Sequence, residues 1–202
     1  DWDAAPRPWI IGHRGVGDSL APEQTYASFD QAAAAGAAVE CDAARTADGG
    51  LVCMHDDTTD RTTGVAGYVT RLRLDDLARM NAANHGAWTS RYEPIPTFEG
   101  YLARYGHRSL LMPEAKSAGS ALVLVDAIRR GGVAAATVVQ SFLASELFAM
   151  KDAGIERRYG IRSLLLGSTA PECVAPNATL YGTWAIGCGA AAVDAPWIAS
   201  PH

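Results

Sequence analysis

Three acidic residues and two histidines fall where their side chains could meet around a phosphate ester. Glu40 and Asp42 lie two residues apart in a strand-like stretch, and Glu114 lies in another. Side chains two residues apart on a strand share a face, so Glu40 and Asp42 are expected to point together. Three carboxylates can hold one divalent cation, Mg²⁺ or Ca²⁺, because both ions prefer oxygen ligands. His13 and His55 each follow an apolar stretch, and imidazoles can exchange protons near neutral pH.

The elements that must position these residues alternate between strand and helix patterns. Apolar runs predict strands at Trp9–Gly12, Ala38–Ala43, Leu51–Met54, Ser109–Glu114, Thr137–Val139 and Arg158–Ile161. Apolar residues at helical spacing predict a helix after Thr25 and others at Leu72–Met80, Thr97–Tyr105, Ser120–Arg130 and Ser145–Ala153. The alternation predicts a parallel α/β architecture with polar residues just after the strands, as on the active face of a (β/α)8 barrel. A doubly wound sheet uses the same edge, but no GxGxxG or phosphate-loop pattern favours it.

Length and composition indicate one soluble domain, residues 1–202. Of the 202 residues 49% are hydrophobic, and no Ser/Pro-rich linker or block of charge divides the chain. The net charge of -5, without basic clusters, argues against a nucleic-acid-binding surface. No apolar run approaches the ~20 residues of a transmembrane segment. No signal peptide is visible, and a start at Asp1 rather than Met indicates a processed or trimmed product, either cytoplasmic or secreted.

Four cysteines leave the redox compartment open. Cys41 and Cys53 lie in predicted core strands and are expected to be buried thiols. Cys173 and Cys188 lie in a loop-rich tail, where they could pair as a disulfide or stay free. No CxxC or Cys/His spacing indicates a zinc site.

Short motifs follow one another over roughly residues 9 to 186. They are His13-Arg14-Gly15, Ala21-Pro22-Glu23 with Thr25, Glu40-x-Asp42, Asp48-Gly49, His55-Asp56, Asp60-Arg61-Thr62-Thr63, Glu114-x-Lys116, Gln140-Ser141-Phe142 and Trp184. In this order they resemble the glycerophosphodiester phosphodiesterase family, whose fold is a TIM barrel. The resemblance implies a TIM (β/α)8-type barrel that hydrolyses a small-molecule phosphodiester to an alcohol and glycerol 3-phosphate.

The resemblance also implies a role for each matching position. The cation ligands would be Glu40, Asp42 and Glu114, and the general acid and base would be His13 and His55 in an order that the sequence leaves open. The substrate-binding residues would be Arg14, Lys116 and Trp184.

Chemistry supports these substrate-binding roles, and each has an alternative. Arg14 has a planar fork that suits two phosphate oxygens, although it could instead pair with Glu23. Lys116 shares a strand face with Glu114, so it could add positive charge at the phosphate or tune that carboxyl group. Trp184 could form an apolar wall for the alcohol or belong to the core. Glu23 could order its loop or approach the cation, and ordering of the loop is the expected role.

The chain departs from the family pattern at several places. Gln24 stands where Asn is usual, Thr59 where Leu is usual, and Pro113 where an aliphatic residue is usual. The C-terminal part leaves little room between a Trp-bearing strand at Thr179–Ile186 and a faint closing strand at Ala192–Pro196. The barrel is therefore expected to be abbreviated or irregular there.

Two other functions fit parts of the same pattern. A phospholipase of D or C type could use the same cation and histidines on lysophospholipids or sphingolipids, but no basic amphipathic helix is evident. A catalytically weak phosphodiester-binding protein would fit the shortened C-terminal part, but it would not require both histidines and all three acids. The head-group alcohol and the oligomeric state are left open.

Overall fold

The structure is a computed structural model that describes residues 1–2, 4–5, 9–167 and 185–188. Its strands are β1 (Ile11–Gly12), β2 (Ala38–Arg45), β3 (Leu51–Cys53), β4 (Leu111–Ala115), β5 (Val138–Ser141), β6 (Arg162–Gly167) and β7 (Ala185–Cys188). Its helices are α1 (Tyr26–Ala34), α2 (Asp60–Thr63), α3 (Leu74–Leu77), α4 (Phe98–Tyr105), α5 (Ser120–Arg130), α6 (Ala144–Asp152) and α7 (Ile155–Tyr159). Short 3-10 turns lie at Val69–Arg71, Gly86–Trp88 and Ala134–Ala136.

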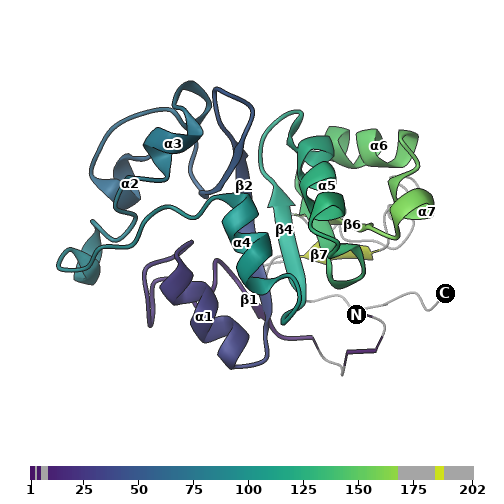
Figure 1. Ribbon diagram of the computed structural model, residues 1–202, viewed down its shortest axis with the longest axis horizontal. Coiled ribbons are helices and arrows are strands. Elements are labelled where there is room, and N and C mark those ends of the chain that lie inside the picture. Colours follow the sequence, from purple (N-terminus) through teal and green to yellow (C-terminus); the bar gives the residue numbers. More distant parts are fainter. Residues whose placement is uncertain (3, 6–8, 168–184, 189–202) are drawn as a thin grey trace.

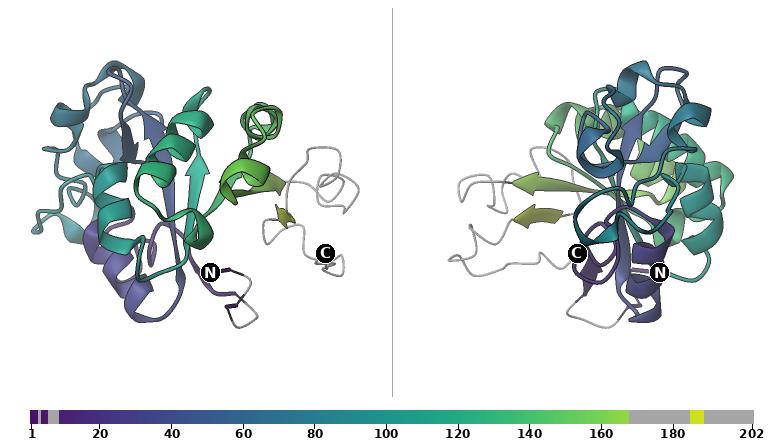
Figure 2. Two further views of the ribbon diagram at one scale, coloured as in Figure 1. Left: turned by 45° about the vertical axis from the view of Figure 1, so that its right-hand side comes forward. Right: turned by 90° about the vertical axis from the view of Figure 1, so that its left-hand side faces the viewer.

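The described strands form one sheet in the order β1-β2-β4-β5-β6-β7, with every neighbouring pair parallel. Apart from β3, which pairs antiparallel with β2, each strand lies beside the next one in the chain. A doubly wound sheet would reverse this order at its switch point, whereas a (β/α)8 barrel does not. Figure 2 shows β6 and β7 side by side at one edge of the sheet.

The two faces of the sheet have different roles. The outward face packs against the helices in the main core, to which Val39, Cys41, Leu111 and Val139 contribute buried side chains. The inward face is apolar near the amino ends of the strands, where a smaller core contains Trp2, Ala38, Met112, Val138 and Leu164. Toward the carboxyl ends the inward positions become polar. Alternation along each strand therefore separates the outward core from the inward face, and the polar residues of the inward face gather toward the carboxyl ends of the strands.

Several sequence predictions agree closely with the structure. The helix predicted at Ser120–Arg130 has those same bounds. Thr25 accepts a hydrogen bond from the Ser28 N–H at the start of α1, and Thr97 does the same for Gly100 at the start of α4. Cys41 and Cys53 are buried free thiols, as predicted. Pro113 lies inside β4, which nevertheless pairs with β2 from Leu111 to Ala115.

Two predictions were wrong. Leu51–Met54 does give a strand, but β3 runs antiparallel to β2, because a short turn joins the two strands as a hairpin. The predicted strand Arg158–Ile161 instead overlaps the end of α7, and the strand β6 begins at Arg162. Glycines with positive φ, Gly154 (63°) and Gly160 (70°), bound this five-residue helix, which is too short to show a helical period.

The segment between β3 and α4 is an insert that lies at the carboxyl end of the sheet (Figure 1, upper left). It carries α2 and α3 and has a small apolar core of its own, in which Met54, Leu77 and Ile95 are buried against Val52 of β3. The helix expected over Leu72–Met80 is shortened to α3.

Other predictions fall outside the described residues. They concern Trp184, Cys173, the side chain of Cys188, the closing strand at Ala192–Pro196 and most of the strand at Thr179–Ile186, of which β7 overlaps only the end. Among the described helices, none has the length and apolar character needed to cross a membrane.

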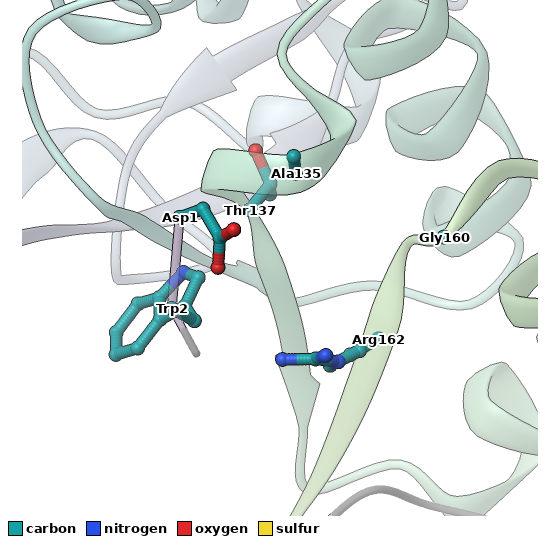
Figure 3. A pocket seen from close by; sticks show the side chains of 6 residues that line it. All are labelled: Asp1, Trp2, Ala135, Thr137, Gly160 and Arg162. Carbon is teal, nitrogen blue, oxygen red and sulfur yellow. The ribbon is translucent and has the colours of Figure 1, made fainter. Parts of the chain in front are cut away.

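A cavity of about 80 Å³ opens at the amino ends of β5 and β6. Figure 3 shows its lining: Asp1, Trp2, Ala135, Thr137, Gly160 and Arg162. It lies at the opposite end of these strands from Gln140 and Ser141, where the polar inward face begins.

Candidate active site

The carboxylates of Glu40, Asp42 and Glu114 meet on the inward face of the sheet. Parallel pairing places Asp42 of β2 directly beside Glu114 of β4, with Glu40 one inward position lower. One oxygen from each carboxylate lies within 4.8 Å of the others. All three residues are buried, with exposed fractions of 2%, 1% and 6% respectively. An all-oxygen donor set of this size suits a hard divalent cation such as Mg²⁺ or Ca²⁺.

Burial and the neighbouring negative charge disfavour ionisation of Glu40 and Glu114. Burial, followed by the charge of Asp42, raises the pKa of Glu40 well above its ordinary value. The same two causes raise the pKa of Glu114 to about 7, against the opposing effect of Lys116. The cluster therefore favours a bound positive charge, either protons or a cation.

We expect divalent cations to stabilise the fold more near pH 8 than near pH 5. Between the ordinary pKa of 4.5 and about 7, the folded protein retains a proton on Glu114 that the unfolded chain has lost. The free energy of unfolding of the cation-free protein therefore falls as pH rises through this window. One pKa unit is about 1.4 kcal/mol, so the loss is roughly 3 kcal/mol, or about 5 °C or more in Tm.

Measurement of Tm as a function of pH, once in chelator and once in saturating Mg²⁺ or Ca²⁺, tests this prediction. Glu114→Gln should flatten the pH dependence in chelator. Glu99→Gln should not, because Glu99 is exposed on α4 and pairs only loosely with Arg130, at 3.8 Å. A cation effect that is equal at both pH values would contradict this account of the cluster.

Three neighbours hold the acids in place. The backbone N–H of Arg14 donates to Glu40 Oε2 (2.6 Å), and Gln140 Nε2 donates to Glu40 Oε1 (3.3 Å). Gln24 Nε2 donates to Asp42 Oδ2 (2.6 Å). Arg14 and Gln24 have φ of 54° and 56°, a left-handed conformation that costs energy in residues other than glycine. The loop after β1 is thus bent so that both residues reach the acids.

Two positively charged side chains border the acidic cluster. Lys116 Nζ lies 3.5 Å from Glu114 Oε1 and 3.6 Å from Asp42 Oδ1. Arg14 Nε lies 3.6 Å from Asp42 Oδ2, while its NH1 donates to both oxygens of Glu23 at 3.2 and 3.3 Å. Of the two alternatives considered for Arg14, the structure shows the pairing with Glu23 and places the guanidinium beside the acidic cluster, while phosphate binding stays a prediction.

His13 and His55 interact through their charges. Partial burial of the ring, and next the charge of Arg14, lower the pKa of His13. A positive His55 acts in the same direction, whereas Asp42 and Glu23 raise the pKa. The two histidines therefore share one electrostatic environment with the acids.

His55 reaches the site by a different route from the one expected. In place of a parallel strand, the β2–β3 hairpin turns the chain back so that Met54 N–H bonds to the Asp42 carbonyl (2.9 Å). The next residue, His55, therefore directly follows the residue whose backbone bonds to Asp42. The strand that His55 follows is thus antiparallel to β2, not a parallel member of the sheet as expected.

Asp56 determines which nitrogen of His55 carries a proton. A hydrogen bond from Arg61 is the main cause that lowers the pKa of Asp56 to about 2. The carboxylate is therefore ionised at neutral pH and can only accept. His55 Nδ1 lies 2.7 Å from Asp56 Oδ1, so Nδ1 must be the donor. The Nε2 lone pair of the neutral ring remains for reacting groups.

Sequence reasoning gave no role to four residues of this site: Gln24, Asp56, Arg61 and Gln140. Each of these residues belongs to a matched motif or directly follows one, and this position is the sequence feature that could have identified it. Of the predicted site residues, Trp184 alone lies outside the described part of the chain.

The model of the glycerophosphoryl diester phosphodiesterase family matches residues 13–127, more than half of the chain and the whole segment from His13 to Lys116. The chain belongs to this family. The family member from Caldanaerobacter subterraneus, a glycerophosphodiester phosphodiesterase, is 35% identical over 104 residues, which are 51% of this chain and 42% of the relative. Human glycerophosphodiester phosphodiesterase 1 is 48% identical over 77 residues, 37% of this chain and 23% of the relative. The matched segments thus span less than half of these relatives.

Solved structures support the same fold. A glycerophosphodiester phosphodiesterase from Agrobacterium tumefaciens is 26% identical, with a TM-score of 0.75 over 89% of this chain and 75% of that one. An Oleispira antarctica phosphodiesterase, solved in complex with sn-glycerol-3-phosphate, is 23% identical, with a TM-score of 0.75 over 90% of this chain and 74% of that one. The predicted (β/α)8-type barrel is confirmed, and the described residues supply an open run of its parallel strands.

Proposed function

We propose that this protein hydrolyses glycerophosphodiesters to an alcohol and glycerol 3-phosphate, using one divalent cation. The observation that carries the proposal is the meeting of the three buried carboxylates with Arg14 and Lys116, inside the segment that matches the family. The names of the relatives support it, as does the product held by the Oleispira structure.

The acidic cluster provides the cation site in this proposal. Glu40, Asp42 and Glu114 would hold Mg²⁺ or Ca²⁺, and the raised pKa values of Glu40 and Glu114 show that this buried site favours a positive charge. A bound cation would polarise the phosphoryl group and neutralise charge on its oxygens. Gln24 and Gln140 keep the oxygens of Asp42 and Glu40 aimed inward.

Each remaining side chain has one task. Arg14 and Lys116 stabilise the charge that develops on the nonbridging phosphoryl oxygens. One histidine takes the proton from the attacking oxygen as the new P–O bond forms. The other gives a proton to the alkoxide as the old P–O bond breaks. His55 acts through Nε2, because Asp56 occupies Nδ1.

The proposal also covers the domain organisation and the role of Trp184. We propose a single domain over residues 1–202, since the described insert contacts the sheet and the loop after β1 and shares a core with β3. The role of Trp184 as an apolar wall for the alcohol stays a prediction.

Turnover of glycerophosphocholine tests the proposal. We expect glycerol 3-phosphate and choline to be released with Mg²⁺ or Ca²⁺ and release to stop in chelator. Choline phosphate as product, or turnover restricted to lysophospholipids or sphingomyelin, would favour the phospholipase. Tight binding of the diester without turnover would favour a binding protein, and either result would contradict the proposal.

A further inference from the structure

We propose that Arg61 is a positioning residue that holds the Asp56 carboxylate against His55 and ties this pair to the loop that carries Arg14. The inference rests on the proposed function, because it concerns a histidine of the same site. It gives a role to the Asp60-Arg61-Thr62-Thr63 motif, which the reaction itself does not use.

Arg61 lies between two carboxylates that come from different parts of the chain. Its Nε donates to Asp56 Oδ2 (2.5 Å) and its NH2 lies 3.2 Å from Asp56 Oδ1. The same NH2 donates to Glu23 Oε1 (2.5 Å), on the loop after β1. Glu23 in turn accepts from Arg14 NH1. A continuous chain of opposite charges therefore runs from Arg14 to the His55 ring.

The contacts of Arg61 require the planar, forked guanidinium group of an arginine. Two nitrogens bind Asp56 side by side, which fixes the plane of its carboxylate, and one of them also reaches Glu23. An ammonium group carries the same charge at a single point and cannot satisfy both acids with the same geometry. Glu23 is only 7% exposed, so it depends on its two arginine partners for compensation of its charge.

The helix that carries Arg61 is anchored although it is short. Thr62 and Thr63 of α2 are buried, and Thr63 Oγ1 donates to the Thr59 carbonyl (2.8 Å). Beyond the helix, Asn84 Nδ2 donates to the Thr63 carbonyl (2.9 Å). His85 contacts both the Thr62 carbonyl (3.2 Å) and Asp18 (2.9 Å) of the loop after β1. The insert therefore holds α2, and with it Arg61, at a fixed place over the site.

Loss of Arg61 should loosen His55 rather than remove a substrate contact. Without its partner, the Asp56 side chain is free to turn away from Nδ1, since the bidentate contact no longer fixes it. The neutral His55 ring would then populate both tautomers, and the fraction with a free Nε2 lone pair would fall. Substrate affinity should change little, because Arg61 bonds only to protein carboxylates among the described residues and Arg14 keeps its own bonds to both oxygens of Glu23 and to Glu40.

Three variants separate this role from a general structural one. Arg61→Gln removes the fork, and Arg61→Lys keeps only the charge. Arg104→Gln is the matched control, because Arg104 is similarly exposed (47% against 42%) and also pairs with an aspartate, Asp30, on the outer helices. We expect Arg61→Gln to lower kcat on the order of 10-fold or more with KM within about twofold, and Arg61→Lys to recover part of the loss. The control should match wild type.

Nitrogen-15 spectra of the histidine rings near pH 8, recorded without substrate or cation, give a readout that does not need turnover. The His55 signal, assigned by its loss in His55→Gln, should show a proton on Nδ1 in wild type and mixed tautomers in Arg61→Gln. A wild-type tautomer and wild-type kcat in a folded Arg61→Gln would overturn the inference. If wild type shows no turnover, the proposed function fails, while the tautomer still decides the role of Arg61.

Discussion

Replacement of Glu40 by alanine is expected to abolish cation-dependent turnover. Glu40 is one of three buried carboxylates that face one another within 4.8 Å, and among the described residues no exposed acid can replace its oxygen at that depth. Cation affinity, measured by calorimetry on the same protein, should fall by on the order of 10²-fold or more, because even indirect contacts to metal ligands contribute 10- to 100-fold.

Glu40→Gln refines this experiment. Glutamine keeps an oxygen that can accept the Arg14 N–H, which now bonds to Glu40 Oε2, but it lacks the negative charge. Both variants should therefore lose turnover, while Glu40→Gln should keep a fold closer to wild type. Glu99→Ala, on the exposed side of α4, is the control and should retain activity. Full activity of Glu40→Ala in chelator-treated protein would refute the cation assignment.

Removal of either histidine should cost on the order of 10²-fold or more in kcat, as for other general acid–base groups. His13→Ala removes a ring whose pKa is lowered by burial and by the charge of Arg14. His55→Ala removes the ring that Asp56 orients. His107→Ala is the control, because His107 is exposed beyond the end of α4.

A substrate with a p-nitrophenol leaving group tells the two roles apart. This leaving group departs as a stable anion and needs no proton, so loss of the general acid should matter much less with it. The variant that this substrate rescues identifies the acid, and the other variant identifies the base. Wild-type rates in either variant with glycerophosphocholine would remove that histidine from the mechanism.

Period-two alternation was enough to predict which acids share a face. Glu40 and Asp42 both point inward, as their spacing on an apolar strand indicated, and parallel pairing places Glu114 beside Asp42 on the same face. Helix α5 could be bounded correctly because its apolar positions repeat at helical spacing and Gly131 follows it. These features depend on the local spacing of apolar and polar residues, which can be read directly from the sequence.

Features that depend on chain direction or on distant contacts could not be predicted in this way. The three-residue strand β3 is apolar throughout, and nothing in it distinguishes a parallel from an antiparallel partner. The contact of Arg61 with Glu23 joins residues 38 positions apart. The reach of Gln24 to Asp42 depends on a left-handed backbone that glutamine rarely adopts.

The most direct test of the central claim is a crystal structure with Mn²⁺, located by its anomalous scattering, as a stand-in for the natural cation. We predict one ion bound by oxygens of Glu40, Asp42 and Glu114, with Lys116 and Arg14 beside it. An ion held by other residues, or no ion at this cluster at a concentration of Mn²⁺ that supports turnover, would contradict the account.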